Sequence, residues 1–149
     1  MYKNILVPTD GSPRSRRAIR LAVRLAREQK ARLTGVWIGP AWEPNLYAYD
    51  RDVPAGFISP SQHSAHVRQV AERRLAAISR AARLAGVPSK CDYTESMFPY
   101  QGIINAAKRN HCDLIVMASH GRRGISRLLL GSETAKVLAL SRIPVLICR

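Results

Sequence analysis

The sequence has few acidic residues, with 10 aspartates and glutamates against 24 lysines and arginines and a formal net charge of +14 over 149 residues. Of the 24 basic residues, 19 are arginine, whose planar guanidinium binds phosphate and carboxylate through paired hydrogen bonds. Such an imbalance concerns partners and solubility and says nothing about the fold. It favours anionic partners, and by itself it does not separate a small ligand from a nucleic acid or an anionic membrane surface.

Cysteines and long apolar runs are also scarce. Cys91, Cys112 and Cys148 are an odd number at wide spacing with no Cys-x-x-Cys pair, which argues against a disulfide framework and a zinc cluster. We expect reduced, mostly buried thiols. Nothing approaches the roughly 18 apolar residues of a membrane span, and the N-terminus shows no signal-peptide pattern. We therefore expect a cytoplasmic protein with no membrane partner.

The remaining composition is typical of one globular domain, with 46% hydrophobic and 23% charged residues. Apolar periodicity predicts strands and helices that alternate along the chain. The predicted strands are Asn4–Val7, Ala31–Ile38, Lys90–Ser96, Asp113–Met117 and Ile143–Cys148, and the predicted helices are Pro13–Lys30, Ser61–Ala85, Pro99–Asn110 and Ser132–Leu140. Each parallel return needs a crossover, so this order predicts an α/β domain with a parallel sheet and helices on both faces.

Several side chains within these elements have two interpretations. The stripe Arg16, Arg20, Arg24 and Arg27 is expected to be a solvated face rather than a docking surface. His63 and His66 have the spacing of two metal ligands, but two histidines make a weak site, and a solvated first helical turn is the favoured interpretation.

The connection Gly39–Pro60 contains four prolines and four of the nine aromatic residues. Connections of this length are uncommon in compact domains and tend to be functional or disordered. Two interpretations stay open: the segment packs over a site or a partner subunit, or it is a mobile insert whose rings cover the core.

The segment Ala118–Gly131 follows an apolar strand, at the end of the sheet where open α/β folds bind ligands. Gly121 and Gly124 allow backbone amides to approach an anion closely, and Gly131-Ser132 begins a helix whose first amides favour a phosphate. The alternative is a glycine-rich connection before a well-capped helix. His120 has two roles open, as a phosphate donor or as a cap on the strand end.

Three segments of the sequence resemble those of a known family. They are Pro8-Thr9-Asp10-Gly11-Ser12, Ala118-x-x-Gly121-x9-Gly131-Ser132 and Pro144-Val145-Leu146-Ile147. Taken in order along the whole chain, they resemble the universal stress protein family. The resemblance implies a Rossmann-like, open five-stranded parallel sheet of order 3-2-1-4-5, an ATP-type nucleotide site in the subclass that binds it, and homodimers paired through the C-terminal strand.

The resemblance and the loop together predict a nucleotide site. Its predicted residues are Pro8, Thr9, Asp10, Val36, Met117, Ala118, Ser119, His120, Gly121, Arg122, Arg123, Gly124, Gly131, Ser132, Glu133 and Thr134. The resemblance implies that Pro8 and Asp10 border the adenosine, Val36 meets the adenine, Met117 flanks the sugar, and the helix start at Ser132 faces the phosphates. Ala118 departs from the family's glycine, which is tolerable if its φ is negative and obstructive if it is positive.

The predicted ligand is ATP, ADP or AMP, and Asp10 and Glu133 are the candidates to hold an accompanying Mg²⁺. No nucleophile with its base is evident, so we expect a stress-response regulatory or signalling module whose ATP hydrolysis is slow or absent. The alternatives are an interaction protein of the same fold that binds no nucleotide and, third, a basic nucleic-acid-associated protein. No recognition motif supports specific binding of nucleic acid.

Overall fold

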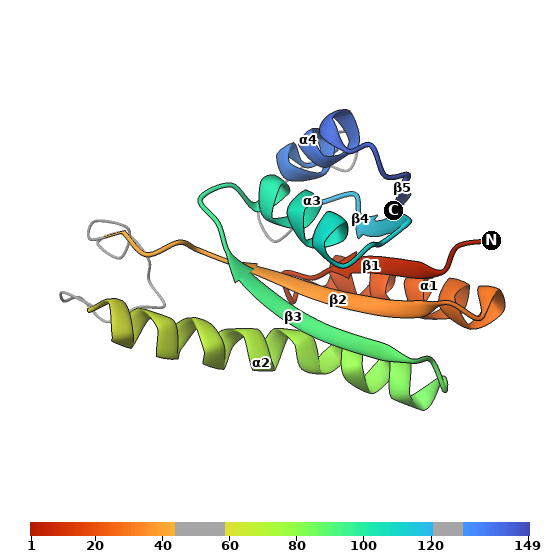
Figure 1. Ribbon diagram of the computed structural model, residues 1–149, viewed down its shortest axis with the longest axis horizontal. Coiled ribbons are helices and arrows are strands. Elements are labelled where there is room, and N and C mark those ends of the chain that lie inside the picture. Colours follow the sequence, from red (N-terminus) through yellow and green to blue (C-terminus); the bar gives the residue numbers. More distant parts are fainter. Residues whose placement is uncertain (44–58, 121–129) are drawn as a thin grey trace.

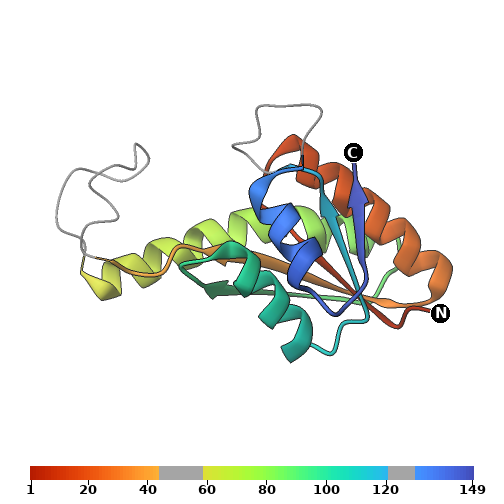
Figure 2. The ribbon, with the colours of Figure 1, turned by 90° about the horizontal axis from the view of Figure 1, so that it is seen from above.

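The computed structural model describes residues 1–43, 59–120 and 130–149. They form a five-stranded parallel sheet of order β3-β2-β1-β4-β5, with two helices on each face (Figures 1 and 2). In chain order the elements are β1 (Asn4–Pro8), α1 (Pro13–Gln29), β2 (Arg32–Gly39), α2 (Pro60–Leu84), β3 (Ser89–Glu95), α3 (Pro99–Arg109), β4 (Leu114–Ala118), α4 (Ser132–Leu140) and β5 (Val145–Cys148). The predicted α/β fold and strand order are confirmed.

Helices α1 and α2 cover one face of the sheet. Apolar residues at helical spacing on α1, such as Ile19 and Ala22, pack with Ile78 of α2 against Ile5 and Leu33 of the central strands. These side chains are almost completely buried. The opposite sides of both helices are left to solvent, so their polar residues do not contribute to the core.

The outer sides of α1 and α2 carry arginine. Arg68 of α2 is exposed beside the edge strand β3. The other exposed arginines of the two helices are Arg16, Arg17, Arg20, Arg24 and Arg27 of α1 and Arg73, Arg80 and Arg83 of α2. We call these eight side chains the arginine face. The stripe predicted on the first helix is therefore solvent-exposed, as expected.

Helices α3 and α4 cover the other face of the sheet. Ile103 and Ala107 of α3 pack with Val137 of α4 against Leu6 and Ile115. Since β1 and β4 contribute side chains to both cores, they are buried on both faces. This burial explains their uninterrupted apolar sequences.

Helix α1 begins and α2 ends at signals that the sequence contains. The Ser12 hydroxyl accepts a hydrogen bond from the Ser15 amide at 3.1 Å, and Pro13 follows as the first helical residue. Helix α2 ends before Gly86, which has a φ of +67°. Its start was predicted one residue late, because Ser59 and Gln62 form a capping box that begins the helix at Pro60.

The two edge strands differ in polarity. The polar strand β3 lies at one edge, as predicted, and Asp92 on it pairs with Arg109 of α3 at 3.2 Å. Strand β5 forms the other edge and begins two residues later than predicted. The Ser141 hydroxyl accepts a hydrogen bond from the Ile143 amide at 3.0 Å, and this turn keeps Ile143 out of the strand.

The cysteines are only partly as expected, since Cys112 is buried whereas Cys91 and Cys148 are half-exposed. Burial raises the pKa of the Cys112 thiol, which disfavours its reactive thiolate form. In the described part of the chain, no helix combines the length and the apolar character needed to cross a membrane.

Candidate functional site

The candidate site lies where strand order reverses. Strands β1 and β4 are neighbours in the sheet, but β1 leads through α1 to β2 on one side and β4 leads through α4 to β5 on the other (Figure 1). The loops that follow these two strands therefore separate toward opposite faces of the sheet. In open α/β sheets the crevice between two such loops is the usual place for a ligand.

The loop after β1 is a tight turn held by its own polar side chains. The Thr9 amide donates to the Val36 carbonyl at 2.9 Å, so the end of β1 stays attached to β2. Thr9 Oγ1 accepts from the Gly11 amide at 3.1 Å, and Asp10 Oδ1 accepts from the Ser12 amide at 2.9 Å. Thr9 is buried and Asp10 is half-exposed, which leaves Asp10 as the side chain of this turn that a ligand can reach.

Sequence reasoning missed Arg74, which lies on α2 and reaches this turn. Its guanidinium Nη1 donates a hydrogen bond to the Asp10 carbonyl. A Cβ added to Gly11 would collide with the same guanidinium, and Gly11 also has a φ of +78°. The left-handed backbone therefore favours glycine at this position, and any side chain here would also have to displace the end of Arg74. No local pattern marks Arg74, because its partner lies 64 residues away in the sequence.

The end of β4 and the start of α4 are joined by hydrogen bonds. The Gly131 amide donates to the Ser119 carbonyl at 2.8 Å, and Thr134 Oγ1 donates to the Ala118 carbonyl at 3.0 Å. On the other side, the Ser119 amide donates to the Cys148 carbonyl at 2.8 Å. The predicted approach of the helix start to the strand end is therefore present, although the Gly131 amide itself bonds to protein.

Among the residues that the structure describes, none caps the first turn of α4 with its side chain. Gly131 is its N-cap residue, with φ −59° and ψ 147° and no capping hydrogen bond from a side chain. Helices α1 and α2, in contrast, are capped by Ser12 and Ser59. The first amides of a helix carry a partial positive charge and need acceptors. An anion is a suitable acceptor at α4.

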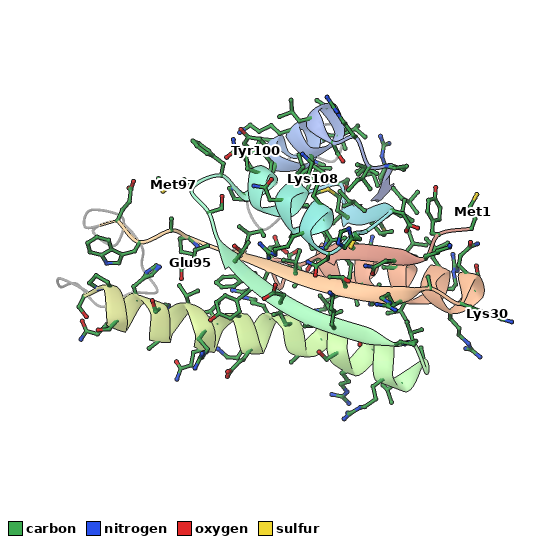
Figure 3. The ribbon with its side chains drawn as sticks, in the orientation of Figure 1. Met1, Lys30, Glu95, Met97, Tyr100 and Lys108 are labelled. Atoms are coloured by element: carbon green, nitrogen blue, oxygen red, sulfur yellow. The ribbon has the colours of Figure 1, made fainter. Side chains whose placement is uncertain are left out.

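Glu133 caps a different helix from its own. Its Oε2 accepts a hydrogen bond from the Tyr100 amide in the first turn of α3 at 2.8 Å, and its Oε1 lies 3.2 Å from Lys136 Nζ. That ammonium also lies 5.2 Å from the centre of the Tyr100 ring, and Figure 3 labels Tyr100 beside α4. The carboxylate thus binds protein donors, whereas the sequence suggested that it holds Mg²⁺.

The backbone at Ala118 tolerates the alanine side chain. Ala118 is the last residue of β4, pairs with Cys148 of β5 and is buried. The described non-glycine residues with positive φ are Lys30 and His111, so the φ of Ala118 is not in the obstructive range. The additional methyl group, compared with glycine, is accommodated in a regular strand.

Other predicted residues are buried near this crevice. Val36 and Met117 pack in the core beneath α3 and α4, with exposures of 0% and 6%, and Pro8 pairs with Val36 between β1 and β2. His120 is buried as well, with Nδ1 3.1 Å from Ser119 Oγ. Contacts of these four residues with a nucleotide stay predictions.

Four predicted residues, Gly121, Arg122, Arg123 and Gly124, lie outside the described part of the chain. The same is true of 44–58, which is most of the predicted loop. The expectations that the arginines face phosphates and that the loop packs over the site therefore stay untested.

The prediction for His63 was wrong. We expected a solvated first turn, but His63 is 1% exposed, and its Nε2 lies 3.1 Å from the Pro40 carbonyl and 3.2 Å from Glu95 Oε2. Figure 3 shows Glu95 near the end of β3. The ring joins the start of α2 to the ends of β2 and β3, a tertiary role that helical spacing does not reveal. Within residues 1–43, 59–120 and 130–149, no group of three or more His, Cys, Asp or Glu side chains is placed to hold a metal.

A shallow, mainly apolar groove of about 370 Å³ lies elsewhere, between α2 and the edge strand β3. Leu75, Cys91 and Tyr93 are among its lining residues. It is on the edge strand, whereas the candidate site lies at the ends of β1 and β4 in the middle of the sheet. The groove is therefore not the predicted site.

The fold is that of an open α/β protein, and the candidate site lies at the reversal of strand order. The universal stress protein family model matches residues 1–149, and the chain belongs to this family. It is 33% identical over 151 residues to universal stress protein YxiE of Bacillus subtilis, with full coverage of both chains. It is 34% identical over 149 residues to a universal stress protein of Thermus aquaticus, again with full coverage.

A solved structure shows the same fold. The structure of MJ0577 of Methanocaldococcus jannaschii has a TM-score of 0.80 at 23% identity, and the match covers 99% of this chain and 95% of that one.

Proposed function

We propose that this universal stress protein binds an adenine nucleotide, ATP in the first place, between the β1–α1 turn and the start of α4. The nucleotide acts as a signal in a cytoplasmic stress-response module. The observation that carries the proposal is the hydrogen bond from Gly131 to Ser119. It fixes an α4 first turn that lacks a side-chain cap at the carboxyl end of β4, beside the turn that contains Asp10.

Ligands of proteins with the same fold support this choice. One solved universal stress protein is in complex with cAMP, with a TM-score of 0.69, 23% identity and coverage of 99% of this chain and 97% of that one. Another, from Archaeoglobus fulgidus, is in complex with dAMP, with a TM-score of 0.70, 19% identity and coverage of 99% and 98%. Both ligands contain adenine and a phosphate, the two groups that the crevice is proposed to receive.

Calorimetric titration with ATP, ADP, AMP and cAMP, with and without Mg²⁺, tests the proposal directly. The key variant is Gly131→Val. The φ of −59° at Gly131 is allowed to any residue, so the variant keeps the fold while its side chain occupies space before α4. We expect at least a tenfold loss of ATP affinity, equal to about 1.4 kcal/mol.

Ala135→Val is the control, because Ala135 is exposed on the next turn of α4 and the substitution ends in the same valine side chain. It should bind ATP like the wild type. If none of the four nucleotides binds the wild type, the proposal fails, and an interaction protein that binds no nucleotide is favoured. If both variants lose affinity equally, the crevice is not the site.

We further propose that Arg122 and Arg123 face the phosphates and that hydrolysis is slow or absent. Replacing both with alanine should weaken ATP binding more than adenosine binding, because adenosine has no phosphate. Equal weakening would place the arginines elsewhere. Release of inorganic phosphate from ATP, measured over hours, tests the second part, and rapid turnover would contradict it.

We also propose that the protein assembles as a homodimer through β5, as its resemblance to the family implies. Strand β5 is an edge strand, and Leu138, Leu140 and Leu146 around it are between 38% and 59% exposed. Exposed leucines beside an unpaired edge favour contact with a second copy. Sedimentation should give a dimer for the wild type and a monomer for Leu146→Arg, while a monomeric wild type would contradict the proposal.

A further inference from the structure

The arginine face is the largest concentration of charge on the described molecule. Its eight arginines are exposed on two helices, α1 and α2, which contact one another on the same side of the sheet. Neither helix contains lysine, and their acidic residues are Glu28 and Glu72. Among the described residues, one ion pair involves this face: Arg24 lies 3.9 Å from the Glu28 carboxylate. Most of this positive charge is therefore not neutralised by the protein itself.

The helices on the opposite side of the sheet show that this charge is not a general property of the surface. Arg109 pairs with Asp92 and Lys136 pairs with Glu133, each at 3.2 Å. Lys108, labelled in Figure 3, is on α3. Basic residues on that side are fewer and are largely matched by carboxylates.

We propose that the arginine face binds the phosphate backbone of double-stranded nucleic acid without reading its sequence. The face follows helices of 17 and 25 residues, which are about 25 and 37 Å long. Double-stranded DNA has one negative charge per about 1.7 Å of its axis, so a duplex offers phosphates along this whole length. A mononucleotide is far shorter. The inference is independent of the proposed nucleotide site.

The chemistry of the face favours phosphate over other anions. Guanidinium groups bind phosphate through two parallel hydrogen bonds, whereas lysine acts as a point charge. An acidic protein partner would need large buried anchors at the centre of its interface. Among the described large apolar residues of α1 and α2, the exposed one is Leu84, at the end of α2. These helices therefore lack such anchors.

The same absence argues against a membrane and against a single strand. Helices that lie in a membrane surface bury an apolar face in lipid, but the apolar faces of α1 and α2 are already buried on the sheet. Proteins that hold single strands stack the bases on aromatic rings, and α1 and α2 contain no phenylalanine, tyrosine or tryptophan. Contacts with phosphates on a duplex need neither feature.

The test measures fluorescence anisotropy of a labelled 24-base-pair duplex of arbitrary sequence between 50 and 200 mM salt. The variant combines Arg17→Gln, Arg20→Gln and Arg73→Gln, which removes three charges from both helices of the face. The control combines Lys3→Gln, Lys108→Gln and Arg142→Gln, three exposed residues that lie off the face. The two proteins have the same net charge and differ only in where it was removed.

We expect the wild type to bind, with log K falling linearly against log salt. The variant should lower the magnitude of that slope by about 3 and weaken binding about tenfold or more at 0.1 M salt. The control should behave like the wild type, and both should retain the wild-type melting temperature.

Four results would overturn the proposal. The first is no binding at 50 mM salt. The second is an equal loss in variant and control, which would mean that charge acts without a defined surface. The third is tighter binding of the single strand than of the duplex. The fourth is displacement of the duplex by vesicles with 30% anionic lipid, which would assign the face to a membrane.

Discussion

The two helical layers of this protein bury similar apolar cores but present different surfaces to solvent. Helices α1 and α2 expose arginine, whereas the region of α4 and β5 exposes leucine, at Leu138, Leu140 and Leu146. Helices α1 and α2 also start at serine caps, whereas α4 does not. A parallel sheet with two covered faces can therefore carry an anion-binding surface on one side and a protein-contact surface on the other.

The largest expected effect comes from isoleucines in the two cores. Ile78 of α2 is 0% exposed and Ile103 of α3 is 6% exposed. Ile78→Ala should lower the free energy of unfolding by about 4 kcal/mol and Ile103→Ala by about 3 kcal/mol, since each leaves a cavity in a packed core. Urea unfolding followed by circular dichroism measures both. One shared transition is expected, and two separate transitions would show that the layers do not fold as one unit.

A smaller effect is expected at two glycines with positive φ. Gly11 has a φ of +78° and is packed against Arg74, whereas Gly86 has a φ of +67° and open space around it. Gly86→Ala should cost about 1 kcal/mol for the left-handed backbone alone, and Gly11→Ala about 2 kcal/mol, because its methyl group also displaces Arg74. In an Arg74→Ala background the two costs should become equal, as thermal unfolding of the double variants would show. A difference that persisted there would rule out the collision as its cause.

The smallest effect concerns the helix starts. Ser12→Ala removes the cap of α1 and should cost about 1 kcal/mol. Ser132→Ala changes an exposed hydroxyl that is not a cap and should change stability by less than about 0.5 kcal/mol without ligand. With saturating ATP, Ser132→Ala should gain less in melting temperature than the wild type. Equal stabilisation of the two proteins by ATP would remove Ser132 from the proposed site.

The parts of the fold that the sequence predicted are those with local causes. Alternating apolar segments predicted every element, and Ser12-Pro13 and Gly86 marked helix ends, because these signals act within one helical turn. The predicted strand ended at Val7, but β1 includes Pro8, since the pairing of Pro8 with Val36 depends on a distant segment.

The backbone geometry around the candidate site was predictable to the same extent. The meeting of β4 with the start of α4 followed from glycine spacing and from the rule for open sheets. The roles of Arg74, His63 and Glu133 were not predictable, because each joins elements that are at least 23 residues apart. Such contacts exist only after the helices have packed on the sheet.

Arg73 and Arg74 are adjacent on α2 but lie in different surroundings. Arg73 belongs to the arginine face, and Arg74 donates to the Asp10 carbonyl beside the proposed nucleotide site. One rigid helix thus connects the two surfaces, and free-energy linkage is reciprocal. If ATP changes the affinity for a duplex by some factor, the duplex must change the affinity for ATP by the same factor.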